Sequence, residues 1–159
     1  MLTADEMSFL EKAIELSKRG MESGNGGPFG CVIVKDNKII GEGNNRVTSL
    51  NDPTAHAEVV AIRDACQKLN SFQLEGCDIY TSCEPCPMCL GAIYWARPGR
   101  VIYANTREEA AAIEFDDEFI YSEINASMMD RKIPFIHSPH PGAKAIFTAW
   151  KTWPGKQKY

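Results

Sequence analysis

The sequence predicts an α/β protein in which helices cover a sheet that contains parallel strand pairing. First, β-rich runs alternate with helical patterns in the order βαβαβ up to about residue 113, which is typical of strands joined by helical crossovers. Second, the length of 159 residues is sufficient for one compact domain. Third, 44% hydrophobic and 24% charged residues are ordinary values for a globular protein. We therefore expect residues 1–159 to form a single domain.

Capping and periodicity predict a first helix that is followed by a hairpin. Thr3 and Glu6 stand three residues apart, as the two partners of a capping box do. Apolar side chains then recur at helical spacing, at Met7, Leu10, Ile14 and Met21. The glycine-rich segment 24–28 ends this helix. Two β-rich runs follow, and the Asp36-Asn37 pair between them predicts a hairpin turn.

Start signals and short apolar runs locate the remaining elements. The segment 51–54 (Asn-Asp-Pro-Thr) supplies capping side chains and a proline, which predicts the start of a helix. Glu84-Pro85 opens another helix in the same way. We expect strands at residues 29–35, 38–43, 78–82 and 100–104. After the first helix we expect helices from about residue 53, from 85 to 96 and from 107 to 113.

The pattern weakens after residue 113. Residues 115–121 mix acidic and aromatic side chains, and residues 134–142 are rich in turn formers. The last ten residues, 150–159, are aromatic and basic. We expect the C-terminal part, about 140–159, to form an arm that packs on a surface and not a separate domain.

Charge and cysteine usage narrow the class of function. The net charge of −4 and the pI of about 5.4 give no basic field that would draw the protein onto nucleic acid. No apolar run approaches the ~20 residues that span a bilayer, and residues 1–6 lack the features of a secretory signal. We therefore expect a cytoplasmic protein that binds a small ligand, without nucleic-acid or membrane partners. In a reducing compartment, clustered cysteines are more often metal ligands or catalytic groups than disulfide partners.

The central motif is a His-Ala-Glu tripeptide at residues 56–58, followed by a Pro-Cys-Pro-Met-Cys run at residues 85–89. Cys86 and Cys89 are three residues apart, so on a helix they project from one face. In the first turn of a helix the macrodipole favours the thiolate, which is the form that binds metal. His56 is expected in the first turn of the earlier helix. Two helix N-termini over a sheet edge would bring these ligands to one ion.

Three ligands of this type predict a catalytic zinc ion. Nitrogen and sulfur ligands suit zinc, and three of them leave the fourth tetrahedral position open for water, whose pKa zinc lowers to roughly 7. Glu58 is two residues from His56, so the two side chains do not share a helical face. The side chains of His56 and Glu58 can therefore both reach the metal only if the ion lies beyond the end of the helix and not along its side. There Glu58 would move protons between water and substrate.

A further cysteine, Cys83, leaves an alternative for the ligand set. Cys83 and Cys86 have the same spacing as Cys86 and Cys89, so Cys83 could close a structural site with four ligands. We assign Cys83 to packing, because Pro85 marks Cys86 as the first helical ligand. An iron–sulfur motif needs another cysteine four places on, and that position is Ile93.

The pattern H-x-E…P-C-x-x-C resembles that of the cytidine deaminase-like superfamily of zinc hydrolases. Nearly the whole chain is similar to bacterial guanine deaminases, in residues 26–30, 44–45, 51–58, 86–97, 115–117 and 159. The resemblance implies a three-layer α/β/α fold with a central mixed five-stranded sheet, a C-terminal arm and one zinc ion per subunit. It also implies hydrolysis of guanine to xanthine and ammonia, with water attacking C2 and Glu58 protonating a ring nitrogen.

The resemblance further implies roles for side chains around the base. Asn45 would hydrogen-bond the purine edge, since an amide offers both donors and an acceptor. Phe29 and Trp95 would supply apolar walls, and Ala57 is placed among the substrate contacts. From the residues alone, Asn45 could merely cap a turn, and Phe29 and Trp95 could be core residues.

Asp117 and Tyr159 complete the implied site. Asp117 matches a second carboxylate that helps to handle the amino group, and Tyr159 matches a residue that closes the site from the partner chain. The implied assembly is a homodimer whose subunits exchange C-terminal segments. Without the resemblance, Asp117 could start a solvated helix, and Tyr159, as the last residue, could be frayed.

Two other functions stay open at this point. One is a deaminase of the same superfamily that acts on adenosine in tRNA, on a cytosine derivative or on a triazine. The negative net charge argues against RNA as a substrate. Only Arg46 and Arg63 lie near the motifs as candidates for binding a phosphate. The other is a non-enzymatic binding module stabilised by zinc, in which Glu58 would have no purpose.

Overall fold

The computed structural model describes all 159 residues, which form two compact units. The first unit, residues 1–117, contains every strand, and the second consists of residues 118–159. The strands are β1 (Gly30–Lys35), β2 (Lys38–Asn44), β3 (Cys77–Cys83) and β4 (Arg100–Asn105). The helices of the first unit are α1 (Ala4–Glu22), α2 (Val47–Leu50), α3 (Ala57–Leu69), α4 (Pro87–Ala96) and α5 (Arg107–Ala111). That both units belong to one domain stays a prediction.

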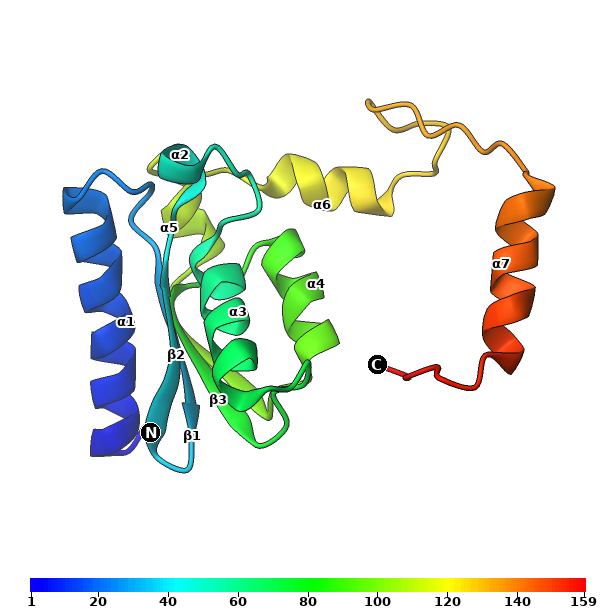
Figure 1. Ribbon diagram of the computed structural model, residues 1–159. Helices are drawn as coiled ribbons and strands as arrows, with labels where there is room; N and C mark the ends of the chain where they lie inside the picture. The colour runs from blue at the N-terminus through cyan, green and yellow to red at the C-terminus, as the bar shows by residue number, and fades with distance from the viewer. The chain divides into compact units, whose positions relative to one another are not determined.

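The four strands form one mixed sheet in the order β2-β1-β3-β4 (Figure 1). β1 runs antiparallel to β2 and β3, whereas β3 and β4 are parallel and are joined through α4. At the hairpin turn, Asp36 and Asn37 both have positive φ, 48° and 59°, which suits the twist of the flanking strands. The mixed sheet agrees with the prediction, but the fifth strand was wrong. After β4 the chain continues into helices, and the sequence beyond residue 113 has no alternating apolar run to form another strand.

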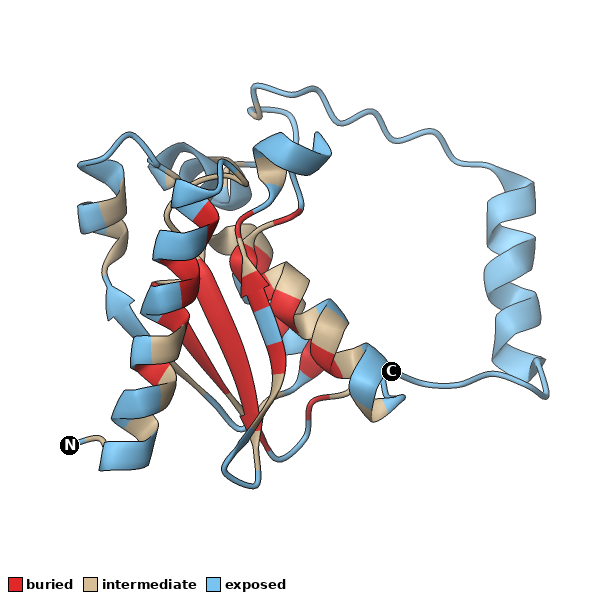
Figure 2. Ribbon diagram, turned by 60° about the vertical axis from the view of Figure 1, so that its left-hand side comes forward, coloured by how far each residue is buried: buried red, intermediate tan, exposed pale blue.

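Helices cover both faces of the sheet (Figure 1), and buried residues lie along the strands and on the helices that cover them (Figure 2). Each face has its own apolar core. The core under α1 consists of Leu10, Leu16, Val32, Val34 and Tyr80. The core under α3 and α4 consists of Cys31, Ile33, Ala57, Ala61, Ala65, Leu74, Cys77, Ile79, Ile93 and Ala96. β1 and β3 contribute to both cores because successive strand residues point to opposite faces.

Two glycines of β2 allow α3 to lie directly on the sheet. A Cβ atom at Gly41 would come within 2.6 Å of the Ala61 carbonyl oxygen. A Cβ atom at Gly43 would come within 2.3 Å of the Ala57 carbonyl oxygen. The main chain of α3 therefore rests on the main chain of β2. This contact sets the height of the first turn of α3 above the sheet.

The first helix begins as predicted, but it buries a different face. Thr3 and Glu6 form the capping box, each side chain accepting a hydrogen bond from the other residue's backbone N–H. Of the four apolar residues that predicted the buried face, only one is buried; the exposed ones are Met7, Ile14 and Met21. The buried residues of α1 are Leu10, Ala13, Leu16, Ser17 and Gly20. The small residues Ala13, Ser17 and Gly20 on this face let the helix approach the sheet. The spacing of the large apolar residues did not indicate that this face would be buried.

The helix that carries the histidine starts later than predicted. Asp52 accepts hydrogen bonds from the backbone N–H and the hydroxyl of Thr54, at 2.8 and 2.7 Å. This side chain therefore closes a local turn instead of capping a helix. The N-cap residue of α3 is His56, and the N-cap residue of α4 is Cys86. Both ligands lie one position before their helices and not in the first turns.

The second unit contains two helices that the sequence did not predict, α6 (Glu118–Asn125) and α7 (Pro141–Thr152). At the start of α7, the Nδ1 atom of His140 accepts a hydrogen bond from the Gly142 N–H at 3.1 Å. The stretch expected to be only turn-rich thus supplies a helix cap. Exposed apolar side chains of α7 include Ile146, Phe147 and Trp150. Across the whole chain, no helix combines the length and apolar character needed to cross a membrane.

We expect Gly43→Ala to lower the free energy of unfolding by about 1–3 kcal/mol, because the added methyl group has to push α3 away from the sheet. Urea unfolding followed by circular dichroism measures this change. The matched control is Gly91→Ala in α4, where an added Cβ meets nothing within 4 Å. It should leave stability unchanged or raise it by about 0.4–1 kcal/mol. Wild-type stability of the Gly43 variant would contradict the main-chain contact.

Candidate active site

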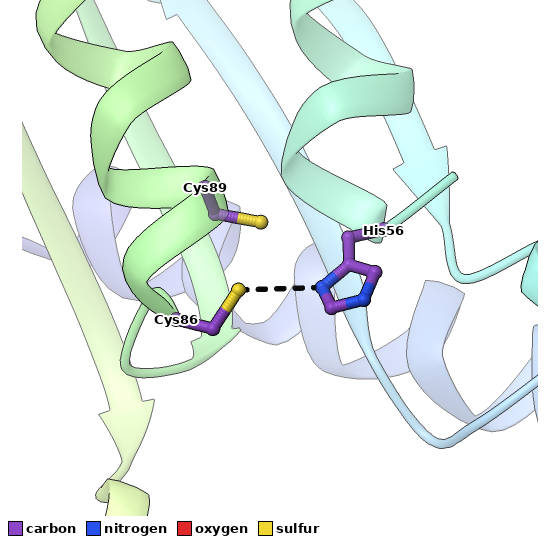
Figure 3. A group of neighbouring side chains, drawn as sticks. All are labelled: His56, Cys86 and Cys89. Atoms are coloured by element: carbon purple, nitrogen blue, oxygen red, sulfur yellow. Dashed lines mark hydrogen bonds between the residues drawn. The ribbon is translucent and has the colours of Figure 1, made fainter. Parts of the chain in front are cut away.

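Three side chains from the starts of two helices meet above the sheet (Figure 3). His56 precedes α3, Cys86 precedes α4, and Cys89 lies in the first turn of α4. One ligand atom from each lies within 4.8 Å of the others, and Cys86 Sγ is 3.5 Å from His56 Nδ1. The structure thus brings together the three residues that the motif singled out. Their ligand atoms lie off the helix ends, as the spacing of His56 and Glu58 required.

The donor set of this metal-ligand group fits a zinc ion. Zn–N distances of about 2.0–2.1 Å and Zn–S distances of about 2.3 Å put neighbouring tetrahedral ligand atoms about 3.3–3.8 Å apart. The 3.5 Å between Cys86 Sγ and His56 Nδ1 lies within this range. Because the group offers three ligand atoms, a tetrahedral ion held there would keep one position for a further ligand.

The surroundings of Cys86 favour its thiolate. The neighbouring Cys89 side chain lowers the pKa of Cys86 to about 4, with a further contribution from His56 and against the opposing effect of burial. The positive end of the α4 dipole acts in the same direction. The pKa of Cys89 is raised, because this thiol lies beside Cys86 and is buried near Glu58. Cys86 is therefore the more acidic of the two thiols, and metal binding requires Cys89 to lose its proton as well.

Glu58 lies beside the metal-ligand group in the first turn of α3 and is only 6% exposed. Its Oε2 atom accepts a hydrogen bond from the Cys89 thiol at 3.3 Å. Its Oε1 atom accepts a hydrogen bond from the Thr81 hydroxyl at 3.0 Å. Burial raises the pKa of Glu58. A buried carboxyl group of this kind, next to a metal site, is suited to accept and return a proton.

Asn45 directly follows β2 and is buried. Its Oδ1 atom accepts a hydrogen bond from the Val47 N–H at 3.1 Å. A Cβ atom at Gly26 would fall 2.2 Å from the same oxygen, so only glycine lets this loop pass. The side chain therefore caps a turn, one of the two readings of the sequence. With its oxygen bonded to the main chain, Asn45 has its amide nitrogen left to contact a ligand.

The other expected substrate contacts lie in different surroundings. Phe29 is half-buried and packs against the core under α3 and α4. It meets Phe115 edge to face, with 4.9 Å between the ring centroids. Ala57 is fully buried next to His56, whereas Trp95 on α4 is 63% exposed. Phe29 and Ala57 are thus held by packing within the first unit, and Trp95 lies at the surface of the chain.

Asp117 and Tyr159 belong to different units. Asp117 ends the first unit. Partial burial raises the pKa of Asp117, and the negative charge of Cys86 contributes in the same direction. Tyr159 ends the second unit, and its role in the site stays a prediction.

Cys83 lies outside the metal-ligand group. Its thiol donates a hydrogen bond to the Thr106 carbonyl oxygen at 3.7 Å. Burial raises the pKa of Cys83 to about 11, so this thiol stays protonated at neutral pH. Neither feature suits a metal ligand, and the group that the structure assembles has three members.

Two residues beside the site were given no role from the sequence, Thr81 and Phe115. Thr81 contacts Glu58, and Phe115 contacts Phe29. A signal for Thr81 was present, because strand alternation places it on the same face as Ile79, which belongs to the core. A polar side chain on such a face needs a buried partner. Phe115 offered no comparable signal.

Comparison with known proteins gives the class of the protein. Residues 3–105 match the family model described as the cytidine and deoxycytidylate deaminase zinc-binding region. The chain belongs to this family of zinc-binding deaminases. It is 54% identical to the guanine deaminase of Bacillus subtilis (strain 168) over 152 residues. The matched segment covers 96% of this chain and 97% of that protein.

Structures and more distant relatives support the same class. The X-ray structure of guanine deaminase from Bacillus subtilis matches with a TM-score of 0.95 and 52% identity, over 99% of both chains. A tRNA-specific adenosine deaminase of Aquifex aeolicus is 46% identical over 96 residues, which cover 60% of this chain and 63% of that protein. The chain is therefore a zinc-dependent hydrolytic deaminase.

We expect iodoacetamide to modify Cys86 of the metal-free protein at pH 6, since a pKa of about 4 leaves its thiolate formed there. The rate should fall as the pH drops through about 4, because the thiol then becomes protonated. Cys83, with a pKa of about 11, should stay unmodified at pH 6. Peptide mass spectrometry measures both sites, and added zinc should protect Cys86.

Zinc content provides the matched comparison. Cys83→Ala should retain one zinc ion per chain, and Cys86→Ala should lose it. Loss of zinc from the Cys83 variant would contradict the three-ligand group.

Proposed function

We propose that this chain hydrolyses guanine to xanthine and ammonia, with its zinc ion held by His56, Cys86 and Cys89. The observation that carries the proposal is the metal-ligand group with a buried carboxylate, Glu58, beside it. The relative that is 54% identical over 96% of the chain is a guanine deaminase, which favours guanine over other aminated rings. We place the enzyme in purine breakdown or salvage in the cytoplasm.

The reaction replaces nitrogen by oxygen at one ring carbon. Water adds at C2 of guanine, the exocyclic amino group leaves as ammonia, and C2 becomes a carbonyl carbon. When bound, zinc supplies a Lewis acid that lowers the pKa of a bound water to about 7. The residues of this chain hold the ring, exclude water and move the protons.

Glu58 is the proton carrier in this proposal. Its Oε2 atom, 3.3 Å from Cys89 Sγ, faces the metal-ligand group. Burial raises the pKa of Glu58 and so makes the carboxylate a better proton acceptor. Glu58 takes a proton from the attacking water and delivers it to a ring nitrogen. Because the side chain is shielded from solvent, this proton is not exchanged with bulk water between the two transfers.

Asn45 and Phe29 hold the base. The amide nitrogen of Asn45 donates to an acceptor on the purine edge, where guanine presents O6 and N7. Its oxygen is bonded to the Val47 N–H, so the amide cannot turn over without losing that bond. Phe29, fixed by its edge-to-face contact with Phe115, forms an apolar wall. Ala57 and Trp95 complete the contacts.

Asp117 handles the amino group as it leaves. Its pKa is raised by partial burial and by the charge of Cys86, so the carboxyl group exchanges protons more readily near neutral pH than an ordinary aspartate does. A carboxylate in this place accepts hydrogen bonds from the amine of guanine and from the departing ammonia.

The C-terminal segment closes the site in a homodimer. α7 presents exposed apolar side chains, Ile146, Phe147 and Trp150 among them, that a monomer leaves in contact with water. Exchange of this segment between two subunits covers them and brings the partner subunit's Tyr159 over the bound base.

A panel of bases and nucleosides with ammonia release as the readout tests the substrate. We expect turnover of guanine and no turnover of cytosine, cytidine or adenosine in tRNA, because the donor amide of Asn45 suits the acceptors on the purine edge of guanine. Turnover of a cytosine compound or of tRNA, with guanine inert, would refute the guanine assignment and leave the deaminase family intact.

Glu58→Gln should retain zinc and lose guanine turnover by about 100- to 10,000-fold, because an amide cannot accept the proton. Elemental analysis and ammonia release measure the two properties. The matched control is Glu11→Gln, an exposed carboxylate of α1, which should keep wild-type turnover. Undiminished activity of the Glu58 variant would rule out its role as proton carrier.

Removal of the residues after Trp150 should abolish turnover while zinc is retained, because the site then loses its cover and the partner subunit's Tyr159. Turnover and zinc content are measured on the same sample, and sedimentation gives the oligomeric state. Tyr159→Ala in the full-length chain separates the side chain from the arm. Normal turnover by the truncated chain would exclude a covering role.

A further inference from the structure

Thr81 is a buried hydroxyl residue with two acceptors within reach and one proton to donate. It is 1% exposed. Its Oγ1 atom lies 3.0 Å from Glu58 Oε1 and 3.4 Å from the Gly30 carbonyl oxygen. The nearer acceptor is a carboxylate, and hydrogen bonds to ionised groups are the shorter and stronger ones. The hydroxyl proton is therefore directed to Glu58.

This bond determines which oxygen of Glu58 faces the metal-ligand group. Thr81 holds Oε1, and Oε2 is the oxygen that lies 3.3 Å from Cys89 Sγ. The terminal torsion of a glutamate has broad energy minima, so the carboxylate plane is not fixed by its own side chain. The bond from Thr81 to Oε1 restricts this torsion, and without it the carboxylate plane is able to turn.

Thr81 is itself held firmly. It lies in β3, which is paired on both sides, with Cys31 of β1 and Tyr103 of β4 as the residues opposite. Its side chain is β-branched and therefore stiff at χ1. The hydroxyl has little freedom to follow a moving carboxylate, and it acts as a fixed point in the floor of the site.

We propose that Thr81 is a positioning residue for the deamination, whose hydroxyl holds the Glu58 carboxylate with Oε2 toward the reacting atoms. The proposal deepens the proposed function and rests on it, since Glu58 is the proton carrier there. Thr81 acts through Glu58 alone. It gives no ligand to the metal-ligand group.

Thr81→Val tests this role, because valine keeps the shape of the side chain and removes the hydroxyl. With guanine as substrate, kcat should fall roughly ten- to a hundredfold, the loss expected for one hydrogen bond to a charged group. KM should stay within about twofold of the wild-type value, and zinc should stay at one ion per chain. Thr81→Ser, which restores a hydroxyl, should recover most of kcat.

The matched control is Ser82→Ala. Ser82 is the next residue of the same strand, and its hydroxyl accepts a hydrogen bond from the Gly30 N–H at 3.0 Å. This variant loses a buried hydrogen bond of β3 that does not involve Glu58, so it should lose stability but keep kcat. Thermal unfolding compares the two variants. If Thr81→Val does not fold, Thr81→Ala removes the same hydroxyl without added methyl groups.

Three outcomes overturn the positioning role: wild-type kcat without the hydroxyl, a kcat of Thr81→Ser as low as that of Thr81→Val, or an equal loss of kcat in Ser82→Ala. If wild-type protein does not turn over guanine, the proposed function fails. Crystal structures of wild type and Thr81→Val with zinc then decide the positioning role separately. A turned Glu58 carboxylate in the variant supports it, and an unmoved carboxylate overturns it.

Discussion

Two helices begin at one point above the sheet, and the rest of the site depends on this convergence. His56 and Cys86 occupy equivalent N-cap positions of α3 and α4, so both side chains emerge where the helices leave backbone N–H groups unpaired. The positive ends of two helix dipoles meet there and favour anions. Cys86, Cys89 and Glu58 all lie at this point, and a divalent cation there would offset the negative charge of their ionised forms.

The hydrogen bonds of the site link metal binding to catalysis. The Cys89 thiol donates to Glu58 Oε2. When Cys89 loses its proton to serve as a ligand, that donor disappears, and Oε2 becomes available to water or substrate. The bond from Thr81 to Oε1 is unaffected by this change. Glu58 thus loses the hydrogen bond to Oε2 and keeps the hydrogen bond to Oε1.

Local chemistry could be predicted from the sequence, and packing could not. The ligand spacing of Cys86 and Cys89 and the capping box of Thr3 are relations between neighbours in the chain, and the structure contains both. The count of five strands was wrong, because it came from a resemblance and not from an alternating run in this chain. The buried face of α1 and the later start of α3 depend on contacts with the sheet and on the turn at Asp52, which no periodicity records. Thr81 was overlooked because its partner lies 23 residues away.

The glycines of β2 have a consequence for how this enzyme can change. Peptide groups have the same dimensions in every protein, so a helix seated on the backbone at Gly41 and Gly43 has a spacing that does not depend on which side chains fill the core. Substitutions among the neighbouring aliphatic residues can alter volume and stability while the carboxylate keeps its distance from the strands. Aliphatic core residues can therefore be substituted during evolution, while the position of Glu58 above the strands stays the same.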